Sequence, residues 1–123
     1  AFIFSMITNN TWIGYSDAAT EGTFVWESGC SSTYTNWGSG EPNNGNNFQD
    51  YAYIGYLSND LWDDHDNDEA LSCACQQTSF TLNPIPDPCS PGWTFFDGVC
   101  YYVGNTISSY TDCRTQCSNM NSD

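Results

Sequence analysis

The stretch YTNWGSGEPNN (residues 34–44) lies in a long segment between Trp26 and Tyr51 that is rich in glycine, asparagine and serine. Runs with the residue pattern of β-strands flank this segment on both sides, so we interpret it as a loop within a β framework. A loop of this length inside a compact domain is usually functional or held by something specific. We therefore expect it to be one or the other.

Short runs rich in aromatic and β-branched residues, bounded by Gly, Asn or Asp, predict the strands of this framework. Trp62 is expected to anchor a further strand that presents Asp63 and Asp64. The apolar run at residues 2–7 is too short to distinguish a helix from a strand, and both stay open. The predicted strands are WIGYS (12–16), TFVW (23–26), YAYIGYL (51–57) and LSCACQ (71–76).

Composition divides the chain into three parts, residues 1–77, 78–88 and 89–123. The middle part has three prolines in five positions, which predicts an extended connector. In the third part, GWTFFDGVCYYVG (92–104) predicts a β-hairpin around an Asp-Gly turn. SSYTDCRTQCSNM (108–120) predicts a short helix opened by a serine cap.

The charge of the chain limits its partners. Fifteen acidic residues stand against one basic residue, Arg114, and the formal net charge is −14. This charge repels phosphate backbones and anionic lipids, so we expect neither nucleic acid nor membranes as partners. No apolar run approaches the ~20 residues that cross a bilayer, which also argues against membrane insertion. The same field attracts divalent cations, and calcium is the first candidate.

Seven cysteines in 123 residues indicate an oxidising compartment, and we expect a secreted, extracellular protein with a disulfide framework. The chain starts at Ala1 without a Met or a basic leader, which we interpret as a mature or excised segment. Asn9, in Asn9-Asn10-Thr11, lies in an acceptor sequence for N-glycosylation.

Several motifs in order carry a resemblance to a known family: WIGYSD (12–17), GTFVWESG (22–29), YTNWGSGEPNN (34–44), LWDD (61–64) and LSCACQ (71–76). Together they resemble the second half of a C-type lectin-like domain, and residues 89–123 resemble the opening hairpin and first helix of the same domain. The resemblance implies an α+β fold with small antiparallel sheets, a long calcium-binding loop, one or two short helices and disulfide staples.

The two halves of the domain stand in reversed order along the chain. In the family the first and last strands lie side by side, so the connector at residues 78–88 is long enough to join them. A truly permuted domain would have this order. A unit cut from a tandem array, in which the two halves belong to neighbouring domains, would have it too, and both interpretations stay open.

The resemblance also implies how the cysteines pair. Cys30 is left over, and we expect either a buried free thiol or a link to another chain. Tyr51 and Asn67 replace the cysteines of the usual bridge in the second loop, so this loop must be held by something else, for which a bound cation is the obvious candidate. The implied pairs are Cys89–Cys100, Cys75–Cys117 and Cys73–Cys113.

A calcium site follows from the same resemblance. Calcium takes six to eight oxygen ligands, and side-chain carboxylates and amides supply them. Pro42 is expected to follow a cis peptide bond. The residues that match the calcium ligands of the family by position are Glu41, Asn43, Gln49, Asp63 and Asp64.

Four of these residues, Glu41, Asn43, Gln49 and Asp63, are also the expected sugar ligands. The familiar pattern has Glu at position 49 and Asn at position 63, so the two residue types are exchanged here. The Glu-Pro-Asn motif implies sugars with equatorial 3- and 4-hydroxyls, such as mannose, rather than galactose. Each sugar hydroxyl would donate to a carboxylate and accept from an amide.

We therefore expect calcium-dependent binding of mannose-type glycans, weak at each site (~mM) and used multivalently. The alternative is a structural repeat unit of an extracellular filament or matrix, calcium-stabilised and glycosylated, without lectin activity. Self-association or tandem repeats fit both functions. We expect no enzyme, because His65 is a lone histidine in an acidic run and no catalytic motif is present.

Overall fold

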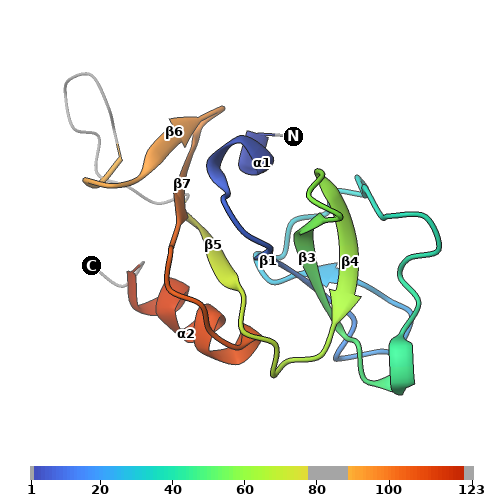
Figure 1. The fold of residues 1–123 in the computed structure, drawn as a ribbon. Helices are drawn as coiled ribbons and strands as arrows, with labels where there is room; N and C mark the ends of the chain where they lie inside the picture. Colours follow the sequence, from blue (N-terminus) through green and yellow to red (C-terminus); the bar gives the residue numbers. More distant parts are fainter. Residues whose placement is uncertain (1, 78–88, 121–123) are drawn as a thin grey trace.

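The computed structural model describes residues 2–77 and 89–120, which form one mixed sheet with helices at its sides (Figure 1). The first part contains helix α1 (Phe2–Met6) and strands β1 (Thr11–Ser16), β2 (Val25–Trp26), β3 (Tyr51–Tyr56), β4 (Leu61–His65) and β5 (Ser72–Gln77). The second part adds β6 (Thr94–Phe96), β7 (Val99–Val103) and helix α2 (Tyr110–Met120).

The sheet of the described residues has seven strands, in the order β4-β3-β1-β5-β7-β6, with β2 paired to β1. Neighbouring strands pair antiparallel, as the resemblance implied, with one exception. Strands β1 and β5 are parallel, and this pair joins the antiparallel strands into a single sheet. Because β5 pairs with β7, the end of the first part lies beside the hairpin of the second. The connector predicted at residues 78–88 lies outside the described residues.

The local predictions are confirmed in most places. Residues 2–7, left open between helix and strand, contain helix α1, and the strand predicted at 23–26 is reduced to β2. The hairpin turns at Asp97 and Gly98, which both have positive φ, as a type I′ turn requires. Helix α2 has the expected serine cap, since the backbone N–H of Asp112 donates to Ser109 Oγ at 3.2 Å.

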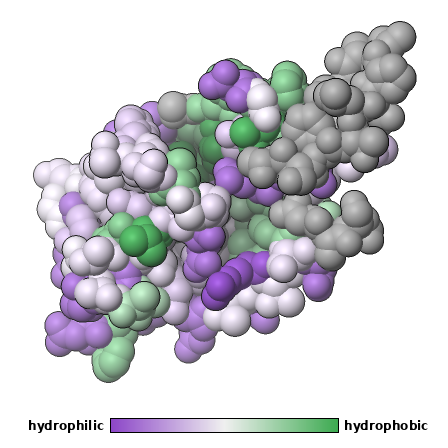
Figure 2. Space-filling view, turned by 180° about the vertical axis from the view of Figure 1, so that it is seen from behind, coloured by the Kyte–Doolittle hydropathy of each residue, from purple (hydrophilic) through white to green (hydrophobic). Residues whose placement is uncertain are grey.

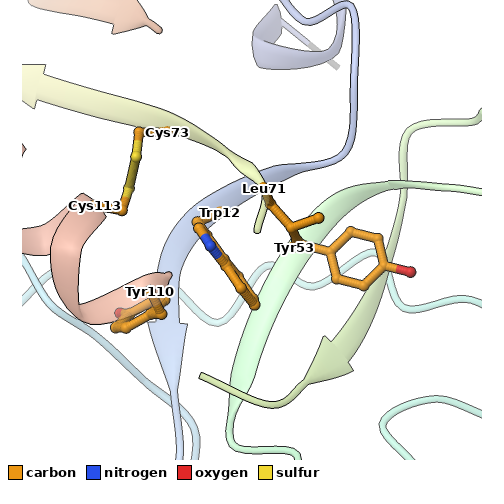
Figure 3. Close-up of a cluster of buried hydrophobic side chains, with 6 residues drawn as sticks. All are labelled: Trp12, Tyr53, Leu71, Cys73, Tyr110 and Cys113. Atoms are coloured by element: carbon orange, nitrogen blue, oxygen red, sulfur yellow. A yellow bond between two sulfur atoms is a disulfide. The ribbon is translucent and has the colours of Figure 1, made fainter. Parts of the chain in front are cut away.

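Aromatic side chains and disulfides build the core between α2 and the sheet (Figure 3). Trp12 is 1% exposed, and its ring meets those of Tyr53 and Tyr110 edge to face at 6.3 and 5.6 Å. Its indole N–H donates to the backbone carbonyl of Ser108 at 3.0 Å, so no polar group of this tryptophan is buried without a partner. A second buried cluster packs Tyr15, Ala52, Ile54 and Trp62 on the other side of the sheet.

The disulfides attach the second part of the chain to the first. Two bridges link neighbouring turns of α2 to alternate residues of β5, and the third links the segment before β6 to strand β7. These are the three pairs that the resemblance implied: Cys73–Cys113, Cys75–Cys117 and Cys89–Cys100. Cys30 forms no disulfide within the described ranges, but it is exposed, so the prediction of a buried thiol was wrong.

The loop after β4 is attached to helix α2, where the sequence pointed to a cation. Asn67 Oδ1 accepts hydrogen bonds from the backbone N–H of Thr111 at 2.9 Å and from its hydroxyl at 2.7 Å. The ring of Tyr51 packs on that of Tyr110 at 4.2 Å. The two residues that replace the usual cysteines therefore make non-covalent contacts with the helix, and the cation expected to hold the loop stays a prediction.

Candidate functional site

Asp64 connects the long loop to strand β4. Its side chain is completely buried, and its two carboxylate oxygens accept hydrogen bonds from the backbone N–H groups of Asn43 at 2.9 Å and Asn44 at 2.8 Å. The peptide bond between Glu41 and Pro42, just before these residues, is cis, as predicted. Asp64 thereby holds the Glu-Pro-Asn segment against strand β4.

Glu41, Asp63 and Asp64 come together at this point. One carboxylate oxygen of each lies within 4.8 Å of the others, which makes them the one group of acidic, histidine or cysteine side chains in the described residues that could surround a metal ion. Glu41 Oε2 and Asp63 Oδ1 are buried and have no hydrogen-bond partner among these residues. Burying polar oxygens without a partner is costly, so the arrangement calls for a positive ligand.

The electrostatics of the cluster favour the same ligand. Partial burial, together with the nearby Asp63 and Asp64 carboxyls, raises the pKa of Glu41 to about 7. The one Lys or Arg of the chain, Arg114, lies elsewhere and pairs with Glu27 at 3.2 Å. The residues present therefore fit a calcium ion, a hard cation that binds several carboxylate and carbonyl oxygens at about 2.3–2.6 Å.

The two predicted amide ligands, Asn43 and Gln49, lie on the same loop, and their side-chain oxygens lie near Gly45. Gln49 Oε1 accepts a hydrogen bond from the backbone N–H of Gly45. Asn43 Oδ1 lies on the same side, since a Cβ placed on Gly45 would be 3.2 Å from it. The structure thus groups Glu41, Asp63 and Asp64 into the cluster, whereas Asn43 and Gln49 converge on Gly45 beside it.

A second group of acids, Asp17, Glu21 and Asp50, lies near the long loop. Asp17 is 3% exposed; its Oδ2 accepts from the backbone N–H of Gly22 at 2.8 Å, and its Oδ1 has no partner among the described residues. Burial, followed by the charges of Asp17, Asp66 and Asp64, raises the pKa of Asp50. The side-chain amide of Asn44 donates to Glu21 at 2.7 Å. The sequence analysis missed Asp17 and Glu21, although their acidic types and spacing of four residues are visible in the sequence.

Tyr53 is a further residue that sequence reasoning missed. Its hydroxyl donates a hydrogen bond to Asp63 Oδ2 at 2.9 Å, and its ring belongs to the aromatic core. The contact arises because Tyr53 on β3 and Asp63 on β4 are directly opposite each other in the antiparallel register. The contact between Tyr53 and Asp63 could be predicted from the sequence only if the register of β3 and β4 were known.

Two other residues considered in the sequence are not part of the cluster of acids. Asn9 is exposed in the segment between α1 and β1, so its side chain is accessible to modification, and its glycosylation stays a prediction. His65 Nδ1 accepts a hydrogen bond from the backbone N–H of Asp66 at 2.9 Å. No described helix is long and apolar enough to cross a membrane.

A large apolar cavity of about 560 Å³ lies elsewhere, between α2, α1 and the sheet. Its lining includes Ile3, Ile13, Trp26, Tyr101 and Arg114, and none of the predicted calcium ligands. Seen from behind, the molecule is hollowed and hydrophobic side chains show inside the hollow (Figure 2). This cavity was not predicted from the sequence.

Comparison with known proteins identifies the family. The sequence model of the C-type lectin domain matches residues 1–77, so the chain belongs to the C-type lectin domain family. Among its relatives, the lectin BRA-3 of Megabalanus rosa is 37% identical over 78 residues, which are 62% of this chain and 48% of that protein. C-type mannose receptor 2 of Mus musculus is 25% identical over 114 residues, which are 90% of this chain and 8% of the receptor.

Among solved structures, the C-type lectin CEL-I from Cucumaria echinata is 31% identical, with a TM-score of 0.48 over 53% of this chain and 51% of that chain. The present chain thus spans about half the length of the lectin BRA-3 and a small fraction of the receptor. Its relatives are named as lectins and receptors.

Proposed function

We propose that this chain binds carbohydrate through a calcium ion held by Glu41, Asp63 and Asp64. One observation carries the proposal: three carboxylates converge within 4.8 Å, and two of them have a buried oxygen without a partner. The ion supplies a Lewis-acidic centre on which two sugar hydroxyls can lie. Family membership supports carbohydrate as the ligand, since the matched relatives include lectins.

The residues around the cluster support recognition of a vicinal diol. Glu41 accepts a hydrogen bond from a sugar hydroxyl, and the amide of Asn43 donates one to the same hydroxyl. Asp63 and Gln49 form the second acceptor and donor pair, for the neighbouring hydroxyl. We infer preference for equatorial 3- and 4-hydroxyls, as in mannose, from the Glu41-Pro42-Asn43 motif. A contact this small gives weak affinity, ~mM for each site.

A titration tests the proposal. Calcium is titrated calorimetrically into metal-stripped protein, and the calcium-loaded protein is then titrated with mannose and with galactose. We expect saturable calcium uptake, and heat from mannose that disappears in a chelator. Asp63→Ala should strongly weaken calcium uptake and remove the mannose heat, whereas Asp68→Ala, which removes an exposed acid outside the cluster, should change neither. Calcium uptake without sugar binding, or preference for galactose, contradicts the proposed ligand.

The acids near Asp17 and Asp50 are proposed to support the same calcium site through their charge, not to hold an ion of their own. The unpartnered Oδ1 of Asp17 and the raised pKa of Asp50 indicate uncompensated negative charge there. Asn44 links the two acidic groups, because its backbone N–H binds Asp64 and its side chain binds Glu21. We expect Asp17→Asn to weaken calcium binding at the cluster without changing the calcium stoichiometry.

The structural alternative, a repeat unit of an extracellular assembly, is favoured by two observations. Cys30 is exposed and unpaired within the described part of the chain. It lies two residues after Ser28, which lines the apolar cavity. The alignment with the receptor covers 90% of the chain, so it extends beyond residues 1–77 and preserves the order of the two parts. This order fits a unit of a tandem array better than a permuted domain.

Elution from a mannose column and fibre assembly separate the two functions, and the mass of the unreduced protein shows whether Cys30 is bridged. A repeat unit linked through Cys30 runs as a dimer or larger species, which reduction or Cys30→Ser converts to monomer. A lectin, in whatever oligomeric state, is eluted from a mannose column by a chelator. Regular fibres that form without sugar and survive a chelator would favour the structural function. Secretion into an oxidising compartment is proposed for both, because three disulfides hold the described fold.

A further inference from the structure

Tyr53 stands between the aromatic core and the cluster of acids. Its ring lies beside Trp12 and Leu71, and its side chain is 6% exposed. In Figure 3 its hydroxyl points away from this core. The hydroxyl donates to Asp63 Oδ2 at 2.9 Å, so a rigid core residue holds one oxygen of a proposed calcium ligand.

This hydrogen bond gives the two carboxylate oxygens of Asp63 different roles. Oδ2 is occupied by the phenol, whereas Oδ1 is buried without a hydrogen-bond partner in the described residues. A carboxylate held in this way offers one oxygen to an ion in a fixed direction. Without the phenol, the side chain would be free to rotate about its terminal torsion, which is broad for aspartate, and to turn away from Glu41.

Tyr53 is suited to this task. Because the ring is buried and packs against Trp12 in the core, the position of the hydroxyl is set by the fold and does not depend on the ion. The phenol acts on the carboxylate as a hydrogen-bond donor, since its hydroxyl donates to Asp63 Oδ2. Its dipole also offsets part of the repulsion between Asp63 and Glu41 while no ion is bound.

We propose that Tyr53 is a positioning residue for calcium, whose hydroxyl fixes Asp63 so that Oδ1 is available to the ion together with Glu41 and Asp64. The inference rests on the proposed calcium site. It adds a specific role for a core residue outside the ligand set: Tyr53 prepares the site before the ion arrives. Partners that orient metal ligands typically contribute about 10- to 100-fold to metal affinity.

The test compares two matched variants by calcium titration. Tyr53→Phe removes only the hydroxyl and is expected to weaken calcium binding about 10-fold or more. Tyr51→Phe removes the same group on the same strand, where the ring packs on Tyr110 instead, and is expected to leave the affinity unchanged. Unfolding of both variants in a chelator shows whether a loss of affinity merely reflects a loss of stability.

A double-mutant cycle tests whether Tyr53 acts through Asp63. In an Asp63→Ala background, any residual calcium binding should not respond to Tyr53→Phe, since the carboxylate to be positioned is absent. A second readout uses the wild-type protein, so it does not depend on how any variant folds. With ¹³C-labelled tyrosine, the ring signal of Tyr53 should shift on calcium addition, while that of Tyr51 should not.

The outcomes separate this inference from the proposed function. If the wild-type protein takes up no calcium, the calcium site itself is wrong, and the inference fails with it. If the wild-type protein binds calcium but Tyr53→Phe stays within two-fold of Tyr51→Phe, or the Tyr53 signal does not move, the positioning role is wrong and the calcium site stands.

Discussion

Two regions of the molecule are held by different forces, and we call them the covalent end, formed by α2 and β5, and the loop end, formed by the long loop and β4. At the end formed by α2 and β5, two disulfides and an aromatic cluster fix the helix on the strand. At the end formed by the long loop and β4, three carboxylates lie within 4.8 Å of one another, and the lone Lys or Arg of the chain pairs with Glu27 elsewhere. One end is a covalent frame, and the other is a repulsive site that a cation would neutralise.

This difference indicates how the fold supports the site. Asp63 and Asp64 lie on a strand of the same sheet that the disulfides anchor, so carboxylates that repel each other stay together. A loop alone would relax by moving them apart. We therefore expect changes at the covalent end to affect stability, and changes at the loop end to affect calcium binding.

The largest expected effect comes from breaking the covalent end. Replacing both Cys75 and Cys117 by Ala opens a bridge between residues 42 apart in sequence and should lower the free energy of unfolding by about 2–5 kcal/mol. Urea unfolding in a chelator measures this loss. Cys30→Ser, which removes a cysteine outside the three bridges, is the control and should cost almost nothing. Equal losses in both variants would show that the bridge contributes no stability.

A smaller effect is expected where the strand joins the loop. Asp64→Asn replaces an acceptor by an NH₂ group that faces a backbone N–H, and should lower the free energy of unfolding in a chelator by about 1–3 kcal/mol. It should also weaken calcium binding, which titration measures. The matched control is Asp68→Asn, because Asp68 is exposed. A variant as stable as this control would contradict the anchoring role of Asp64.

The pH dependence of stability should come from the loop end. The pKa of Glu41 is raised from 4.5 to about 7 in the folded chain without metal, so the folded state binds this proton more tightly than the unfolded state. Its contribution to stability is present below the unfolded pKa and is lost as pH rises through about 7. In a chelator, the Tm should fall by a few degrees across this range.

Calcium should oppose this loss, because it replaces the proton at Glu41. Conversely, calcium binding should weaken as pH falls below about 7. Glu41→Gln removes the titrating group and should flatten this part of the pH profile, whereas Glu69→Gln, which changes an exposed glutamate, should not. Identical profiles for the two variants would show that the group responsible lies elsewhere.

The smallest effect is expected for the ion pair that joins the two parts of the chain. Arg114 lies 3.2 Å from Glu27, but its side chain is 67% exposed. Arg114→Gln should therefore change the free energy of unfolding by only about 0.2–1 kcal/mol. Urea unfolding at low and high salt measures this, with Thr115→Gln as a neighbouring surface control. A loss comparable to that of a disulfide would contradict the view that covalent bonds dominate this end.

The sequence predicted much of the fold because its signals are local or ordered along the chain. The Asp97-Gly98 pair predicts its own turn, and the serine at the start of α2 predicts its cap. The disulfide pairs were implied by the resemblance to the C-type lectin-like domain, and the structure contains them. The contact between Asn67 and Thr111 was missed because it joins residues 44 apart that no motif connects.

The candidate site was predicted in part for the same reason. Glu41, Asp63 and Asp64 belong to motifs, and the structure brings them together. Tyr53 belongs to a strand that reads simply as core, and its contact with Asp63 depends on the β3–β4 register. The hydrogen bond from Gly45 to Gln49 depends on the path of the loop, which propensities do not determine.

A crystal structure of the protein grown with calcium tests the central claim most directly. The account predicts an ion bound by oxygens of Glu41, Asp63 and Asp64 at about 2.3–2.6 Å, with Tyr53 still donating to Asp63. Calcium-saturated crystals in which these three carboxylates bind no ion, or in which they point away from one another, would contradict it.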